Sequence, residues 1–347
     1  MHATQHTPTV TVLGMGGTIA MTRTGTGGVK PALSAGELLS SISGLSEMDV
    51  NIEVADVRRI PGASLTFADM RDLDHAIKKA FIAGADAAVV TQGTDTIEET
   101  SYLLDVWHQG PQPIVITGAM RNPAQAGHDG PANLLAAVRT AASPMARGRG
   151  VMVVMADEIH AAGRVCKTHA TSPGAFTSPG YGPIGQLTEA CPQFFGLPLQ
   201  RLTIPLPRSD SQPRVALVTA GLGDQGELLD GLSAGFDGLV VAAMGAGHVP
   251  APLVPKLQQI SNRIPVIFTT RTGAGSTLTE TYAFPGSEQD LLERGLIPGG
   301  FLHPLKARIL LLATLAAGIS REDLMTVFAA AGSYTRPAIS LSHSQPE

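Results

Sequence analysis

The stretch that decides the fold is TVTVL followed at once by GMGGTIAMT, at residues 9–22. A short β-branched run that ends in clustered glycines is typical of a strand followed by a binding loop. Two interpretations fit this stretch. It is either the phosphate loop of a dinucleotide-binding fold or a loop that exposes a reactive hydroxyl, and the rest of the sequence has to decide between them.

The dinucleotide fingerprint G-x-G-x-x-G requires a third glycine where this chain has Ile19. It also requires a helix directly after the loop and an acidic residue about twenty positions later. The chain continues instead with TRTGTGGVKP at residues 22–31, which is loop material, and it contains no G-x-x-x-x-G-K-[ST] motif. We therefore predict that the glycine loop binds no nucleotide and places Thr18 just beyond a strand end.

The composition excludes several classes of protein. The chain has 347 residues, of which 44% are hydrophobic and 15% charged, enough for two domains with large cores. Its formal charge is −5 with no basic run, so no nucleic-acid partner is expected. We find no secretory signal and no apolar run long enough to span a membrane. Cys166 and Cys191 lack zinc-site companions and fit a reducing compartment. We expect a cytoplasmic protein without metal or membrane partner.

The first two hundred residues alternate apolar runs with helix-like segments. The runs are continuously apolar, which indicates a parallel sheet buried on both faces, with binding loops at the carboxyl ends of its strands. The candidate strands are residues 10–13, 87–91, 114–117 and 151–155. Apolar residues at three- and four-residue spacing predict helices at residues 34–42, 67–84, 97–109 and 130–143.

A stretch rich in proline, serine and charge then predicts a linker at residues 207–213. The fold class that follows is α/β, with two α/β domains. The larger is an N-terminal parallel-sheet domain over residues 1–206, and the smaller is a C-terminal flavodoxin-like or Rossmann-like domain over residues 214–347.

The second domain repeats the alternation of strands and helices. Its strand pattern restarts at Val215 with VALVTAG and continues with GLVVAAMGAG and PVIFTT. Helices are expected at residues 253–261 and 306–318. A final helix is expected to begin at Ser320, where Ser320 and Asp323 resemble a capping box.

A second glycine loop adds to the first. AAVVTQGTDTIEETSYLLD, at residues 87–105, reads as a buried strand, a turn and a helix with acids in its first turn. Thr94 and Asp95 therefore lie at a strand end and a helix N-terminus, where backbone N–H groups face outward. Either residue could simply cap the helix, and Thr18 could bond within its own loop. Two glycine-flanked threonines at two strand ends of one sheet favour a shared site.

MGGTIA and QGTDTIEET closely resemble the two signature segments of the bacterial-type L-asparaginase/glutaminase family. GAMR, DGPANL, KTHAT and HPLKARILL follow in the family's order, so the resemblance runs from about Val10 to Phe328. Members of this family hydrolyse a side-chain amide to a carboxylate and ammonia through a threonine nucleophile. The resemblance implies no metal and no cofactor.

The resemblance implies that Thr18 is the nucleophile and that Thr94, Asp95 and Lys167 activate it. A threonine hydroxyl is a weak nucleophile at its free pKa and needs a base. A buried lysine can lose its proton near neutral pH and act as that base, with an aspartate orienting it. Backbone N–H groups around Thr18 and Thr94 are the candidate donors to the oxyanion.

The resemblance also assigns the substrate contacts. Asp95 matches the family's ammonium ligand, Ser64 a carboxylate-binding serine, and Ala119 a residue whose backbone carbonyl lines the amide pocket. Glu280 matches a glutamate that the neighbouring subunit's second domain lends to the site. Because such sites are completed across subunits, the resemblance implies a homotetramer built from close dimers.

Four departures from the family pattern are visible. Met15 stands where the family usually has threonine, Gln92 where it has histidine, and Leu65 where it has glutamine. The loop at residues 22–33 also lacks a tyrosine that normally contacts the nucleophile. The amidase chemistry survives these changes, but Leu65 removes one donor to the substrate, and such a loss can shift substrate discrimination.

The leading hypothesis is a cytoplasmic L-asparaginase, with L-asparagine as the small-molecule substrate. A near alternative keeps the mechanism and takes glutamine or another small amide or lactam. The archaeal amidotransferase subunit shares the motifs but usually has an extra N-terminal domain, and this chain starts its first strand at about residue 9. A non-catalytic amino-acid sensor would have no use for Lys167, and a nicotinamide oxidoreductase would bind a cofactor.

Overall fold

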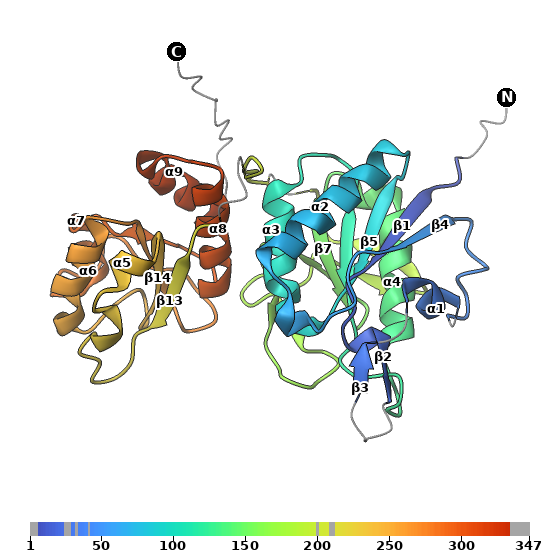
Figure 1. Ribbon diagram of the computed structural model, residues 1–347, viewed down its shortest axis with the longest axis horizontal. Helices are drawn as coiled ribbons and strands as arrows, with labels where there is room; N and C mark the ends of the chain where they lie inside the picture. Colours follow the sequence, from blue (N-terminus) through green and yellow to red (C-terminus); the bar gives the residue numbers. More distant parts are fainter. Residues whose placement is uncertain are drawn as a thin grey trace, which may run out of the picture. The chain divides into compact units, whose positions relative to one another are not determined.

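The computed structural model divides the chain into two compact units, residues 1–199 and residues 200–347 (Figure 1). Of the predicted linker, residues 208–211 lie outside the described part, so its bounds stay a prediction. Most of the loop that lacks the tyrosine, residues 24–28 and 32–33, lies outside it too. The structure describes residues 6–23, 29–31, 34–40, 42–198, 201–207 and 212–333.

An eight-stranded sheet organises the described part of the first unit, in the order β12-β11-β8-β7-β6-β5-β1-β4. Its centre is parallel and contains all four strands predicted for this unit, which confirms them. Every residue of β5, β6 and β7 is buried, as expected where helices cover both faces. The parallel strands are β4 (Asn51–Asp56), β1 (Thr9–Gly14), β5 (Ala87–Thr91), β6 (Ile114–Thr117) and β7 (Val151–Met155).

The outer strands of this sheet were not predicted from the sequence. The edge strand β4 is mostly exposed, and the antiparallel strands beyond β7 are short and only partly buried, so none forms a continuous apolar run. These antiparallel strands are β8 (Glu158–Ala161), β11 (Gly185–Thr188) and β12 (Cys191–Phe194). Residues 22–31, expected as loop, contain parts of a short antiparallel pair, β2 (Met21–Arg23) and β3 (Val29–Pro31).

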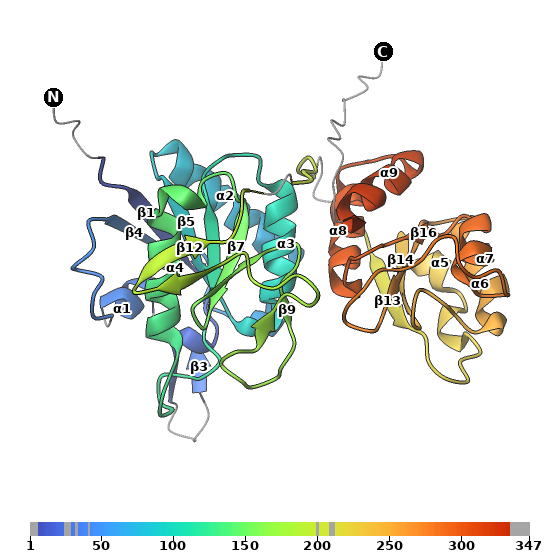
Figure 2. The same ribbon diagram turned by 180° about the vertical axis from the view of Figure 1, so that it is seen from behind.

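The four helices predicted for the first unit are all present, and they cover both faces of the sheet (Figures 1 and 2). Helices α2 (Phe67–Ile82) and α3 (Ile97–Trp107) lie on one face. Helices α1 (Ala35–Ser40) and α4 (Gly130–Ala142) lie on the other, where their apolar residues form one core cluster with the strands. The described part of the first unit also contains the short 3-10 turns η1 (Thr18–Ala20), η2 (Gly62–Ser64), η3 (Thr94–Thr96) and η4 (Pro144–Ala146). The second unit contains η5 (Glu227–Leu229) and η6 (Ala251–Leu253).

A reciprocal cap fixes the start of helix α2, directly after the loop that carries Ser64. The Thr66 side chain accepts from the Asp69 backbone N–H at 3.2 Å. The Asp69 carboxylate accepts from the Thr66 backbone N–H at 2.8 Å and from the Arg58 guanidinium at 2.6 Å. Two backbone donors that the first helical turn leaves open are thereby satisfied.

Replacing Thr66 by alanine should lower the free energy of unfolding by about 1 kcal/mol, because the Asp69 N–H loses its acceptor. Replacing it by serine keeps the hydroxyl and should cost less than half as much. Urea unfolding of both variants and of the wild type measures the difference. Equal stability of the alanine and serine variants would show that the cap contributes nothing here.

The described part of the second unit is built on a four-stranded parallel sheet in the order β13-β14-β15-β16. Its strands are β13 (Val215–Thr219), β14 (Gly238–Ala243), β15 (Val266–Thr270) and β16 (Ile297–Pro298). The first three match the predicted strands, which confirms the smaller α/β domain with a parallel sheet. The fourth has only two residues, too few to give a strand pattern in the sequence.

Helices cover both faces of this second sheet as well (Figures 1 and 2). Helix α8 packs closely, since a Cβ at Gly238 would lie 2.8 Å from Leu311 Cδ2. At the start of the last helix, Ser320 accepts from the Asp323 backbone N–H, which confirms Ser320 as the N-cap, one half of the predicted capping box. The helices are α5 (Leu232–Gly235), α6 (Val254–Ser261), α7 (Glu288–Glu293), α8 (Pro304–Ala316) and α9 (Arg321–Gly332). None of the described helices, in either unit, is long and apolar enough to cross a bilayer.

Candidate active site

Three loops of the first unit meet backbone to backbone at Gly17, Gly62 and Gly93. A Cβ at Gly17 would lie 2.1 Å from the Gly93 backbone nitrogen, and one at Gly62 would lie 2.8 Å from the Gly93 carbonyl oxygen. Real side-chain carbons do not approach other atoms so closely, so only glycine fits at these points. The loops after β1, β4 and β5 are therefore held in contact at the carboxyl edge of the sheet.

Thr18 begins the η1 turn immediately after this contact and is half-buried. Gly16 and Gly17 before it have φ angles of 88° and 89°, a left-handed conformation that L side chains rarely adopt. Because Gly17 touches Gly93, the residues that follow them, Thr18 and Thr94, lie on adjoining segments. The structure thus brings together the two threonines that the sequence placed at separate strand ends.

Thr94, Asp95 and Lys167 form a group beside this junction, joined by one hydrogen bond and one ion pair. Lys167 Nζ donates to Thr94 Oγ1 at 2.8 Å and lies 3.7 Å from Asp95 Oδ1. Thr94 is buried, whereas the Asp95 side chain is 57% exposed and so faces the open side of the site. The Lys167 side chain is only 17% exposed, so its amine is held largely out of water next to a hydroxyl.

Lys167 reaches this position from a short hairpin of β9 (Cys166–Lys167) and β10 (Phe176–Thr177). The backbone N–H of Thr168 donates to the Ala175 carbonyl at 2.7 Å, which closes the hairpin. Just after β10, the Ser178 hydroxyl pairs with Nδ1 of His160 at 3.0 Å. Burial lowers the pKa of His160, although the Glu158 carboxylate 3.2 Å away opposes that shift. A neutral, fully buried His160 therefore ties the hairpin to the main sheet.

Hydrogen bonds to residues at the start of helix α4 hold the loop that carries Ala119 in place. Asp129 accepts from the backbone N–H groups of Met120 and Arg121 at 3.0 and 2.9 Å, and Asn133 donates to the Gly118 carbonyl at 3.1 Å. This explains why DGPANL belongs to the site although none of its residues was assigned a catalytic role. A cavity of about 220 Å³ opens beside the loop, and Ala119 contributes to its largely apolar lining.

Ser64 is exposed at the end of the η2 turn, two residues beyond the glycine contact at Gly62. The Thr96 hydroxyl donates to the Gly62 carbonyl at 3.1 Å and so joins this turn to the Thr94 loop. Leu65, which replaces the family's glutamine, is half-buried and follows Ser64 directly. An apolar side chain therefore stands beside the serine expected to bind the substrate carboxylate.

Two of the departures from the family pattern fall on buried positions. Met15 is fully buried, and its backbone N–H donates to the Thr91 carbonyl at 2.9 Å. Gln92 is also fully buried, and its amide donates to the hydroxyls of Thr96 and Thr100, each at 3.0 Å. Gln92 thus braces the Thr94 loop from inside the unit, a role that the local sequence pattern did not indicate.

Glu280 belongs to the second unit, so the structure does not join it to the other predicted site residues. It is exposed in the segment between β15 and α7. The next two backbone N–H groups, of Thr281 and Tyr282, donate to the buried Glu288 carboxylate at 2.9 and 2.6 Å. Burial opposes ionisation of Glu288, but these N–H groups and the His248 ring outweigh it and lower its pKa. The ionised carboxylate fixes the backbone beside Glu280.

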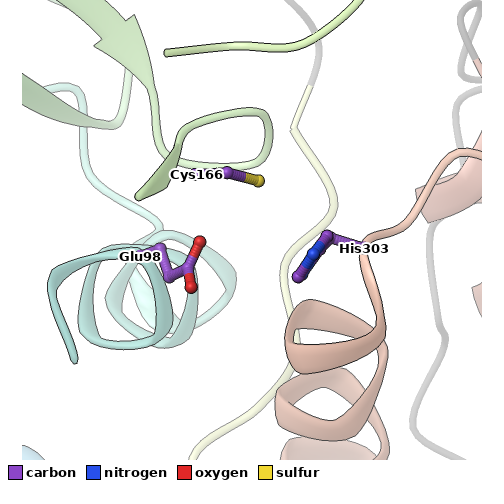
Figure 3. Close-up of side chains that lie close together, drawn as sticks. All are labelled: Glu98, Cys166 and His303. Atoms are coloured by element: carbon purple, nitrogen blue, oxygen red, sulfur yellow. The ribbon is translucent and has the colours of Figure 1, made fainter. Parts of the chain in front are cut away.

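Glu98 and Cys166 are two residues of metal-ligand types that lie close together in the first unit. Glu98 and Cys166 place a carboxylate oxygen and a sulfur within 4.8 Å of each other (Figure 3). His303, also labelled there, belongs to the second unit, where it precedes helix α8. A structural or catalytic zinc site needs three or four protein ligands. The described residues of the first unit offer no such group of three.

The structure therefore gathers six of the seven predicted site residues at one edge of the first sheet. They are Thr18, Ser64, Thr94, Asp95, Ala119 and Lys167. Two hydroxyls beside a largely buried lysine side chain and an exposed aspartate are groups that hydrolases use. A hydrolase is the class of protein that the fold and the site define.

Comparison with known proteins gives the family. The model "Asparaginase, N-terminal" matches residues 9–197, and "Glutaminase/Asparaginase C-terminal domain" matches residues 214–328. The chain is 40% identical over 277 residues to a probable L-asparaginase of Deinococcus radiodurans, covering 78% of this chain and 83% of that protein. It is 34% identical over 311 residues to an L-asparaginase of Bacillus licheniformis, covering 89% and 95%.

A solved structure agrees with these relatives. The crystal structure of a probable cytoplasmic L-asparaginase from Campylobacter jejuni is similar with a TM-score of 0.83 and 28% identity. The match covers 93% of this chain and 99% of that one. The chain belongs to the asparaginase family, which confirms the resemblance found in its sequence.

Proposed function

We propose that this protein hydrolyses L-asparagine to L-aspartate and ammonia through an acyl-enzyme intermediate on Thr18. The observation that carries the proposal is the hydrogen bond of 2.8 Å from Lys167 to Thr94, on a loop that touches the Thr18 loop. The names of the relatives support the substrate, and the family matches over both units support the chemistry.

In the first half of the reaction, the Thr18 hydroxyl oxygen bonds to the carbon of the side-chain amide. Its proton passes to the amine of Lys167, which acts as the base, with Thr94 as the hydroxyl that links the lysine to the reacting groups. The tetrahedral oxyanion is stabilised by backbone N–H groups of the two glycine loops. Lys167 then gives the proton it accepted from Thr18 to the amide nitrogen, the C–N bond breaks, and the nitrogen leaves as ammonia.

In the second half, a water molecule attacks the acyl ester and passes a proton to the same base. The bond between the acyl carbon and the Thr18 oxygen breaks, and the threonine hydroxyl is restored as L-aspartate forms. Because both halves use one base and one oxyanion site, a single cluster of Thr94, Asp95 and Lys167 serves the whole cycle. No metal and no cofactor enters this scheme.

The substrate's charged groups are assigned to the rim of the site. The exposed Asp95 carboxylate takes the α-ammonium group and Ser64 takes the α-carboxylate. Leu65 offers no hydrogen bond at the position next to Ser64, so the site discriminates among amino-acid amides with one polar contact fewer. Glutamine or another small amide is the alternative substrate that this substitution leaves open.

The proposal extends to the assembly and to the location of the protein. Residues 1–206 supply the catalytic groups, residues 207–213 act as a linker, and residues 214–347 lend Glu280 to a neighbouring subunit in a tetramer of two close dimers. A cytoplasmic location follows the Campylobacter jejuni protein, although a relative from Haemophilus influenzae is named periplasmic.

Ammonia release from L-asparagine and, separately, from L-glutamine tests the function. The expected result is fast release from asparagine and release from glutamine that is at least about tenfold slower, the difference a single methylene makes in a fitted site. Faster release from glutamine would give the alternative substrate. Binding of asparagine at equilibrium without ammonia release would contradict catalysis and favour an amino-acid sensor.

A further inference from the structure

Glu98 contacts the backbone of Lys167 from the helix that follows the Thr94 loop. It lies in the first turn of α3 and is only 7% exposed. One of its carboxylate oxygens, Oε2, accepts from the Lys167 backbone N–H at 3.1 Å. Figure 3 shows the Glu98 side chain leaving its helix next to the strand of Cys166, the residue before Lys167.

One continuous segment therefore holds Lys167 at both of its ends. Thr94 accepts from Nζ at 2.8 Å, and Glu98, four residues further along, accepts from the backbone nitrogen at 3.1 Å. A hydrogen bond from a main-chain N–H to a carboxylate 69 positions away is strong and fixes the two segments relative to each other, so it is expected to have a specific role. Lys167 thus spans the distance between the two acceptors, with its backbone nitrogen at Glu98 and its Nζ at Thr94.

Two further contacts of this hairpin involve neither the Lys167 amide nor its amine. The pair of Thr168 and Ala175 closes its turn, and Ser178 ties its far strand to His160. Both contacts keep the hairpin folded. Neither of them sets how far the Lys167 backbone lies from the helix that carries Thr94.

We propose that Glu98 is a positioning residue for amide hydrolysis, which holds the Lys167 backbone at the distance from which Nζ meets Thr94. The inference rests on the proposed function and adds to it a residue that touches neither the substrate nor the reacting atoms. Glu98 acts by accepting a hydrogen bond, so a neutral amide oxygen in the same place can do the same work.

Two substitutions separate this role from loss of charge. Glu98→Ala removes the acceptor and should lower kcat for asparagine about ten- to a hundredfold, as small misplacements of a catalytic group do, with KM changed less than about threefold. Glu98→Gln keeps an acceptor oxygen and should stay within about threefold of wild-type kcat. Glu322→Ala, which removes an exposed acid from the first turn of α9, is the matched control and should leave both constants unchanged.

A double-mutant cycle shows whether Glu98 acts through Lys167. In a Lys167→Met background the amine is already gone, so adding Glu98→Ala should lower the residual kcat less than about twofold, since residues that act as a unit are not additive. A loss as large as in the wild-type background would overturn the proposal, because Glu98 would then act by another route.

Hydrogen exchange at the Lys167 amide gives a readout that needs no activity. The amide should exchange faster in Glu98→Ala than in the wild type, and Glu98→Gln should restore its protection. Unchanged exchange in Glu98→Ala would overturn the positioning role even if the enzyme hydrolyses asparagine. Absence of ammonia release from the wild type, with the exchange result as expected, would instead count against the proposed function alone.

Discussion

Replacing Thr18 by alanine should lower kcat for asparagine hydrolysis by at least about 10,000-fold, because removal of a hydroxyl nucleophile takes away the covalent route itself. KM should change much less, since the predicted contacts to the substrate's charged groups come from Asp95 and Ser64. Thr18 is half-buried and starts a short turn, so the loss of one hydroxyl and one methyl group should leave the fold intact.

The experiment compares ammonia release by the wild type, Thr18→Ala and Thr18→Ser, with unfolding curves for each. Serine keeps a hydroxyl at the same position and should retain measurable activity, which alanine cannot. Thr188→Ala, at an exposed threonine on β11, is purified in the same way as a matched control for contaminating amidases. If Thr18→Ala kept more than about 1% of wild-type kcat with an unchanged fold, Thr18 could not be the nucleophile.

In the first sheet, the strands that were predicted from the sequence are those buried on both faces. Strands β5, β6 and β7 are nearly continuous apolar runs because helices cover them on either side. Strand β1 alternates threonine and valine, but it is buried from Val10 onward and ends in clustered glycines. Strands β8, β11 and β12 alternate or are largely exposed, and their pairing depends on which distant segment lies alongside. A local pattern has no access to such contacts, so the antiparallel half of the sheet could not be predicted.

Some residues of the candidate site could likewise be predicted from the local sequence pattern, and others could not. Thr18 and Thr94 could be proposed from local pattern, because each follows an apolar strand and is flanked by glycine. Lys167 could not, because its hairpin has only two residues in each strand and its meeting with Thr94 spans 73 positions of sequence. The role of Glu98 could not be predicted either, because acidic residues are common in the first turn of a helix. Only the contact with the Lys167 backbone distinguishes Glu98 from them.

The junction of the three glycine loops should be the position least tolerant of a single methyl group. Gly17→Ala puts a Cβ about 2 Å from the Gly93 backbone in a conformation with φ of 89°. The left-handed conformation costs about 1–2 kcal/mol for alanine, and the overlap adds about 1–3 kcal/mol because the obstacle is main chain. The free energy of unfolding should therefore fall by about 2–5 kcal/mol.

Gly17→Ala should also lower kcat more than a hundredfold in the molecules that remain folded, because the adjoining Thr18 must move away from Thr94 by roughly an ångström. Gly148→Ala separates the two causes. Gly148 has a φ of 79°, but its added Cβ would meet nothing within 4 Å, so only the conformational cost of about 1–2 kcal/mol applies and kcat stays at the wild-type value. Urea unfolding and ammonia release are measured on both variants. If both variants lost the same stability and kept full activity, the contact between the Gly17 and Gly93 loops would not be needed for catalysis. The contact at Gly17 would then not hold the two threonines together.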